Sequence, residues 1–338
     1  MEERRKNKEK KENGLSFDEH LQVLVNYFLV FMPYTIFVVI TKYFIKPVNL
    51  YQETILWVIL TGVEIIIVVI IQATWDTFTQ KDKLGMQSHI KTRFLAFGFQ
   101  KKTSSGTMIK DTLILLFCIV VPLDLLSYMI PGCLQYVANS PVGLRFKDLP
   151  LINYLVLGFI YNMLTGVKEE FVFRGYISTR LHEKGKRFSS WFISSIFFGL
   201  AHFDFFAPDL TGPLVWFASA TLVGFLFAGY SLSTNQVLPL MFAHGLSNYI
   251  SAFSIWMFHS TSGFSTMPIN GFLLVFYVPM VLFGCLLAIF FRKRIKEGIN
   301  ALKNLSRETS EQFVAADIGI ILIMIFVFYI IGLFGMQI

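Results

Sequence analysis

The chain is poor in charged residues, proline and cysteine. Only 15% of its 338 residues are Asp, Glu, Lys or Arg, whereas a soluble domain carries about 25%. Eleven prolines and three scattered cysteines exclude a collagen-like chain, a disulfide framework and a cysteine zinc site. What the chain does contain is apolar: 54% of it is hydrophobic, including 37 Phe. This composition predicts a polytopic helical membrane protein in contact with the lipid bilayer.

Long apolar runs dominate the sequence. A helix that crosses a bilayer needs about 20 mainly apolar residues, and the chain has about nine such runs, with eight as the alternative number. We therefore expect an all-α transmembrane helix bundle of 8–9 spans. The predicted spans are Leu21–Phe44, Ile55–Trp75, Thr112–Ile130, Leu151–Val167, Phe188–Phe203, Pro213–Ser231, Val237–Phe258, Gly271–Phe291 and Ala315–Met336.

The basic residues predict how the bundle is oriented. Of 29 Lys and Arg residues, 25 lie in the head before Leu21 and in segments 76–111, 168–187 and 292–307. With nine spans and a cytoplasmic N-terminus, all four segments lie on the cytoplasmic side, as the positive-inside rule requires. The net charge of +7 then reflects topology, and a nucleic-acid partner is not expected.

The same pattern divides the chain into four parts. Residues 1–20 form a charged cytoplasmic head, and residues 21–150 form N-terminal transmembrane helices with a basic cytoplasmic loop. Residues 151–258 form a core, and residues 259–338 form C-terminal transmembrane helices. Within the basic loop, Leu84, Ile90, Phe94 and Phe97 have roughly the spacing of one helical face. This loop is either an amphipathic helix in the membrane interface or an ordinary loop.

Ionisable groups inside a membrane are costly, so each is a candidate site residue. Glu64 and Asp124 are isolated, and we expect them to have structural roles. A dense set begins with the adjacent pair Glu169 and Glu170. On a helix, Glu170 and Arg174 share a face, so Arg174 can neutralise Glu170 and leave Glu169 as a general base. The alternative is a juxtamembrane ion pair beside a solvated acid.

Two histidines and an asparagine complete this set. His202 follows Phe198 at the end of one predicted span, and His244 and Asn248 lie four residues apart on one face of another. Because buried polar groups are best satisfied by one another, we expect Glu169 to converge with these three residues. A Glu–His pair suits activation of water, and a second His with Asn suits stabilisation of an oxyanion. Equally, Glu169, His202 and His244 could hold Zn²⁺ or another divalent ion.

Three motifs resemble a known family. Glu169-Glu170-x-x-x-Arg174, Phe198-x-x-x-His202 and His244-x-x-x-Asn248 are similar, in this order, to the signatures of the CAAX prenyl protease and bacteriocin-processing (CPBP, Abi) family, which includes the Rce1-type intramembrane endopeptidases. The resemblance covers about residues 150–255. It implies a glutamic endopeptidase without cofactor, in which Glu169 is the general base and His202 its partner. His244 and Asn248 would form the oxyanion hole, with Glu170, Arg174 and Phe198 in support.

The resemblance also implies a setting. The substrate would be a membrane-associated protein or peptide, and bacterial members act in peptide maturation, bacteriocin immunity or regulation of surface proteins. Usage rich in Lys, Ile, Phe and Asn is typical of an AT-rich genome, so we expect an integral protein of a bacterial cell membrane. Two other functions remain open. One is a catalytically silent scaffold that binds a membrane-protein partner, and the other is a proton-coupled transporter that uses the same Glu and His.

Overall fold

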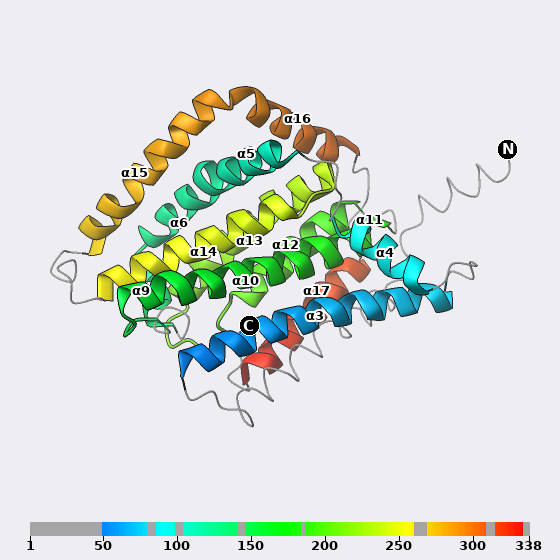
Figure 1. The fold of residues 1–338 in the computed structure, drawn as a ribbon, viewed down its shortest axis with the longest axis horizontal. Helices are drawn as coiled ribbons and strands as arrows, with labels where there is room; N and C mark the ends of the chain where they lie inside the picture. Colours follow the sequence, from blue (N-terminus) through cyan, green and yellow to red (C-terminus); the bar gives the residue numbers. More distant parts are fainter. Residues whose placement is uncertain are drawn as a thin grey trace.

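The computed structural model describes residues 49–79, 86–98, 104–140, 146–183, 187–259, 269–308 and 315–333. Every regular element within these ranges is a helix, which confirms the all-α class (Figure 1). The α-helices are α3 (Leu50–Thr79), α4 (Met86–Ala96), α5 (Ser105–Leu115), α6 (Val121–Tyr128), α7 (Cys133–Asn139), α9 (Leu151–Asn153), α10 (Phe159–Glu170), α11 (Thr179–Glu183), α12 (Arg187–Ala201), α13 (Thr211–Thr234), α14 (Leu238–His259), α15 (Ile269–Phe290), α16 (Arg292–Glu308) and α17 (Ala315–Leu333). Three π-helical segments join some of them: η2 (Leu116–Val120), η3 (Tyr154–Gly158) and η4 (Phe171–Ser178).

Several helices have the length and apolarity of membrane spans, which confirms a multi-pass membrane protein. Among the described residues four stretches qualify, and a fifth is added if α5 to α6 and α7 together form one broken span. The predicted spans over α12, α14 and α17 do not reach this standard, and Leu21–Phe44 lies outside the described residues. The structure therefore supports four or five spans within its described part. The cytoplasmic N-terminus stays a prediction. The four qualifying stretches are Leu50–Thr74, Leu151–Ser178, Thr211–Thr234 and Leu273–Phe290.

Two predicted boundaries are wrong for physical reasons. The span predicted to end at Val167 continues as helix to Ser178, because the charges that follow it are buried and have partners. The Lys168 ammonium lies 4.3 Å from the centre of the Trp57 ring, and Arg174 binds Glu170. Both cations therefore belong to the protein interior and not to a cytoplasmic loop. The helix of the span predicted over 112–130 begins earlier, at Ser105, because the Ser104 side chain caps it by accepting a hydrogen bond from the backbone nitrogen of Thr107. Its predicted end lies at the bend of 100° between Tyr128 and Cys133, where Gly132 has a φ of 86° that favours glycine.

The core of the bundle is a set of helices that run side by side. Helix α10 packs along α14, which in turn contacts α5, and α12 packs along α13 (Figure 1). On one side of this set, α15 contacts η2 and α6, and α16 contacts α13. On the other side, α3 contacts α10 and α17 contacts α12. The motif-bearing helices α10, α12 and α14 thus lie inside the bundle.

Helices α10 and α14 approach each other through two glycines. A Cβ atom on Gly166 would lie 2.4 Å from the backbone nitrogen of Gly245, and one on Gly245 would lie 2.9 Å from the Cα of Met163. In a membrane, where lipid tails are as apolar as the helices, such close backbone contact is a main source of helix association. The two glycines therefore set the distance between these helices.

The basic loop before α5 contains a helix, as one of the two alternatives predicted. Its apolar residues differ in burial, however. Phe97, directly after α4, is fully buried and meets Phe171 and Tyr176 edge-on, whereas Phe94 is 41% exposed. Leu84 lies outside the described residues. Helix α4 is thus anchored on the protein by Phe97.

The Gly166–Gly245 contact gives a first prediction. Replacement Gly166→Ala should lower thermal stability in detergent, because the new methyl group overlaps backbone and forces α10 and α14 apart. Overpacking of this kind costs about 1–3 kcal/mol. The matched control is Gly62→Ala on α3, where an added Cβ meets no atom within 4 Å. Thermal unfolding of the purified protein measures both, and equal melting temperatures for the two variants would contradict the proposed role of the contact.

Candidate active site

The centre of the site is a buried ion pair. Glu170, the last residue of α10, accepts a hydrogen bond of 2.7 Å from Nη1 of Arg174 one turn later, and neither side chain is exposed to solvent. The guanidinium carbon of Arg174 lies 4.1 Å from the centre of the Phe198 ring and 5.5 Å from that of Phe227. A cation is attracted to aromatic faces, more so when it is desolvated. The predicted pairing of Glu170 with Arg174 is therefore seen, with aromatic rings around the charge.

His244 joins this pair from α14. Its Nδ1 lies 2.7 Å from Oε1 of Glu170, the same oxygen that Arg174 binds. Its Nε2 faces Oε2 of Glu169 at 3.5 Å. His244 thus has a carboxylate on each side of its ring, which sequence reasoning did not foresee.

His202 lies just beyond the last residue of α12. Its Nε2 is 3.8 Å from Oε2 of Glu169, and its Nδ1 is 2.8 Å from the carbonyl oxygen of Phe198. Because a carbonyl only accepts hydrogen bonds, Nδ1 carries a proton, and Nε2 of the neutral ring is an acceptor. The acceptor nitrogen of His202 therefore faces Glu169.

Three side chains thus converge on one point. Oε2 of Glu169 is buried, forms no hydrogen bond with any described residue, and faces the Nε2 atoms of His202 and His244. The ring of Phe198 packs against both imidazoles, at 4.6 and 5.4 Å between ring centres. Asn248 lies one turn after His244 and is partly buried, and no polar contact joins it to the other three.

The structure adds residues that sequence reasoning did not assign to the site. Ser247, on α14, donates a hydrogen bond of 3.1 Å to Oδ2 of the buried Asp124 on α6. One turn further along the same pair of helices, the hydroxyls of Tyr128 and Ser251 are hydrogen-bonded. The three-residue spacing from His244 to Ser247 was a signal for this polar stripe, but its partner on α6 could not be identified without the helix packing. Asp124 therefore has a structural contact, as predicted, and its partner Ser247 lies three residues after His244.

A metal centre would require at least three ligand side chains grouped around one point. Among the described residues, no group of three or more His, Cys, Asp or Glu side chains could hold a metal ion, and this includes Glu169, His202 and His244.

Comparison with known proteins identifies a related family. Residues 151–250 match the family model described as Rce1-like, a type II CAAX prenyl endopeptidase, so the chain contains a domain of this kind. All residues of the three motifs lie within these limits. No curated protein and no solved structure matches the chain.

The buried ion pair gives a second prediction. Replacement Arg174→Met should lower the free energy of unfolding by about 3–5 kcal/mol, because it leaves the Glu170 carboxylate buried without its cation. The double variant Glu170→Gln/Arg174→Met, which removes both charges, should regain much of this loss. Thermal unfolding in detergent measures both variants. If the double variant were as unstable as the single one, packing rather than charge would explain the effect.

Proposed function

We propose that this chain is an intramembrane endopeptidase, which hydrolyses a peptide bond of a membrane-associated protein or peptide with a water activated by Glu169. The observation that carries the proposal is the buried Oε2 of Glu169, which faces Nε2 of His202 and of His244 at 3.8 and 3.5 Å. This arrangement lies in a domain that matches an endopeptidase family. Carboxylate and imidazole are the side chains best suited to take a proton from water near neutral pH.

The hydrogen bonds favour a division of labour between the two histidines. Two carboxylates and Arg174 sum to one negative charge, and a buried net charge is costly. His244 has a carboxylate at each ring nitrogen, so protonation of His244 neutralises this negative charge at the lowest cost. His202 stays neutral, with its Nε2 as an acceptor beside Glu169.

A water between these groups would have two hydrogen-bond acceptors, Glu169 and His202, and one donor, protonated His244, around it. At 3.5 and 3.8 Å these contacts are longer than direct hydrogen bonds, so a water can bind beside the three atoms. Such a water would donate to Glu169 and to His202, and as it attacks the peptide carbonyl its proton passes to the carboxylate of Glu169. Glu169 then gives this proton to the leaving amine.

The carbonyl oxygen becomes an oxyanion in this step and requires donors. Protonated His244 presents its Nε2–H at the same point, and Asn248, four residues later on the same helix, carries an amide NH₂. We assign both as oxyanion donors. Loss of one such donor typically slows catalysis by about 100- to 1000-fold. Glu170, Arg174 and Phe198 are positioning residues, since they hold His244 and His202 in place.

The apolar helices support a location inside a membrane, and we propose a bacterial cell membrane and a role in maturation of peptides such as bacteriocins or in immunity to them. Two other functions have separate tests. A silent scaffold is favoured if catalytic-site variants restore a deletion phenotype fully, and a proton-coupled transporter is favoured if proteoliposomes show solute flux.

The catalytic proposal predicts the effect of Glu169→Gln. This isosteric change removes the base, so the rate of cleavage should fall by at least about 100-fold while thermal stability is retained. The matched control is Asp148→Asn, an acid-to-amide change at an exposed residue. Purified protein in proteoliposomes is incubated with internally quenched peptides, one ending in a farnesylated Cys-aliphatic-aliphatic-X sequence and one an unmodified membrane segment. Equal cleavage by wild type and Glu169→Gln would remove Glu169 from the mechanism.

Chelation tests the metal alternative directly. If Glu169 activates water without a metal, cleavage should survive exhaustive treatment with EDTA followed by removal of the chelator. A loss of activity that added Zn²⁺ restores would instead favour a metal held by Glu169, His202 and His244.

A further inference from the structure

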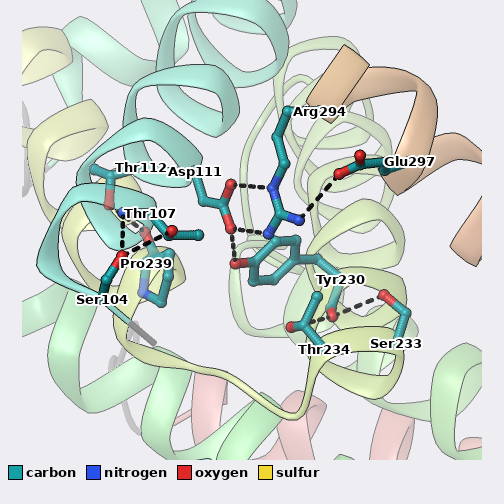
Figure 2. Close-up of polar contacts among 10 residues, drawn as sticks. All are labelled: Ser104, Thr107, Asp111, Thr112, Tyr230, Ser233, Thr234, Pro239, Arg294 and Glu297. Atoms are coloured by element: carbon teal, nitrogen blue, oxygen red, sulfur yellow. Dashed lines mark hydrogen bonds and ion pairs between the residues drawn. The ribbon is translucent and has the colours of Figure 1, made fainter. Parts of the chain in front are cut away.

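Helix α16 is fixed to the bundle by a cluster of polar contacts that includes none of the site residues described above. Figure 2 shows Arg294 of α16 reaching Asp111 of α5, with Nε and Nη2 donating to the two carboxylate oxygens at 2.8 and 2.7 Å. The hydroxyl of Tyr230 on α13 donates to the same carboxylate at 2.7 Å. These hydrogen bonds, donated by Arg294 to the buried Asp111 carboxylate, raise the pKa of the guanidinium further. Helices α5, α13 and α16 are thereby joined at one point.

A second set of contacts fixes the rotation of α16 about its axis. Leu302 and Leu305 pack with Trp191 of α12 and Ala228 of α13. Since Arg294, Leu302 and Leu305 all point toward the protein, the opposite edge of the helix points away from it. That edge carries Arg292, Lys293, Lys296 and Ile299, all exposed. None of the three basic residues forms an ion pair with any described residue; Glu297 instead pairs with Arg294 at 3.5 Å.

The exposed edge of α16 follows a row of exposed apolar residues on α15. Only Phe291 separates the two helices: its nitrogen binds the oxygen of Leu287 at 2.8 Å, and its oxygen binds the nitrogen of Ile295 at 3.0 Å. Figure 1 shows that α16 leaves α15 at a marked angle at this point. Leu282, Leu286 and Ile289 form the exposed row on α15, and Lys293 and Lys296 are exposed at the start of α16.

The change from exposed apolar to exposed basic residues coincides with the end of a membrane span. The span Leu273–Phe290 ends two residues before Arg292. Exposed apolar side chains on a spanning helix face acyl chains, so the exposed residues directly after the span lie at the depth of the headgroups. Basic residues at that depth are attracted to anionic lipids.

We propose that Arg292, Lys293 and Lys296 bind the headgroups of anionic phospholipids at the bilayer surface. The phosphate oxygens accept hydrogen bonds from the three cations, while Ile299 contacts the adjoining acyl chains. Asp111 and Tyr230 hold α16 so that this edge cannot rotate toward the protein. The partner is the bilayer itself, and the surface lies outside the Rce1-like domain, so the inference does not depend on the proposed catalysis.

The experiment compares lipids of equal chain length and different headgroup charge. Purified full-length protein in neutral detergent is titrated with palmitoyl-oleoyl phosphatidylglycerol or with the corresponding phosphatidylcholine, and the melting temperature is followed. Because a ligand that binds the folded state stabilises it, phosphatidylglycerol should raise the melting temperature more than phosphatidylcholine. Half a molar NaCl should reduce the difference, since salt screens surface charges.

Two variants, each lacking three positive charges, show whether phosphatidylglycerol binds at α16 or elsewhere on the protein. In Arg292→Gln/Lys293→Gln/Lys296→Gln the apparent affinity for phosphatidylglycerol should fall at least tenfold, with an unchanged melting temperature in detergent alone. The control is Lys91→Gln/Lys110→Gln/Lys147→Gln, which removes three exposed charges elsewhere and should keep the wild-type affinity. The proposal is overturned if both variants lose affinity equally, or if the α16 variant keeps its preference for phosphatidylglycerol.

Discussion

Glu170 is the residue on which the rest of the arrangement depends. Its Oε1 oxygen is shared by Arg174 on the same helix and by His244 on α14, at 2.7 Å each. A buried carboxylate is tolerated only when its partners are close and well oriented. The contact of His244 with Glu170 therefore requires α10 and α14 to pack in one register, and that register brings His244 next to Glu169. Phe198 and Phe227 complete the surroundings of Arg174 and so tie α12 and α13 to the same centre.

The matched domain of residues 151–250 is supported by parts of the chain outside it. Asp124 on α6 accepts a hydrogen bond from Ser247, and Trp57 on α3 covers the ammonium of Lys168. The loop after His202 is contacted by α17, where Tyr329 packs against Phe205 and Phe206. Helices on the N-terminal and C-terminal sides of the matched domain thus contact it and help to hold its helices in place.

The sequence predicted what local spacing determines and missed what helix packing determines. The pairing of Glu170 with Arg174 follows from a four-residue spacing on a helix, and the approach of Glu169 to two histidines follows from the cost of isolated polar groups in apolar surroundings. The bond between His244 and Glu170 could not be predicted, because it depends on the register of α10 against α14. The end of the span at Ser178 was missed for a related reason: hydropathy counts Lys168 and Glu170 as charges, but their partners make them part of the interior.

The contact between Gly166 and Gly245 determines which amino-acid replacements the site can tolerate. Because the closest approach of α10 to α14 is backbone against backbone, their separation does not depend on any side-chain rotamer. Glu169 follows Gly166 by less than one turn, and His244 adjoins Gly245. The separation of the backbone positions that carry the acid and the imidazole is therefore determined by main-chain geometry. Apolar side chains elsewhere along the two helices can exchange for others of similar volume while these backbone positions keep their separation.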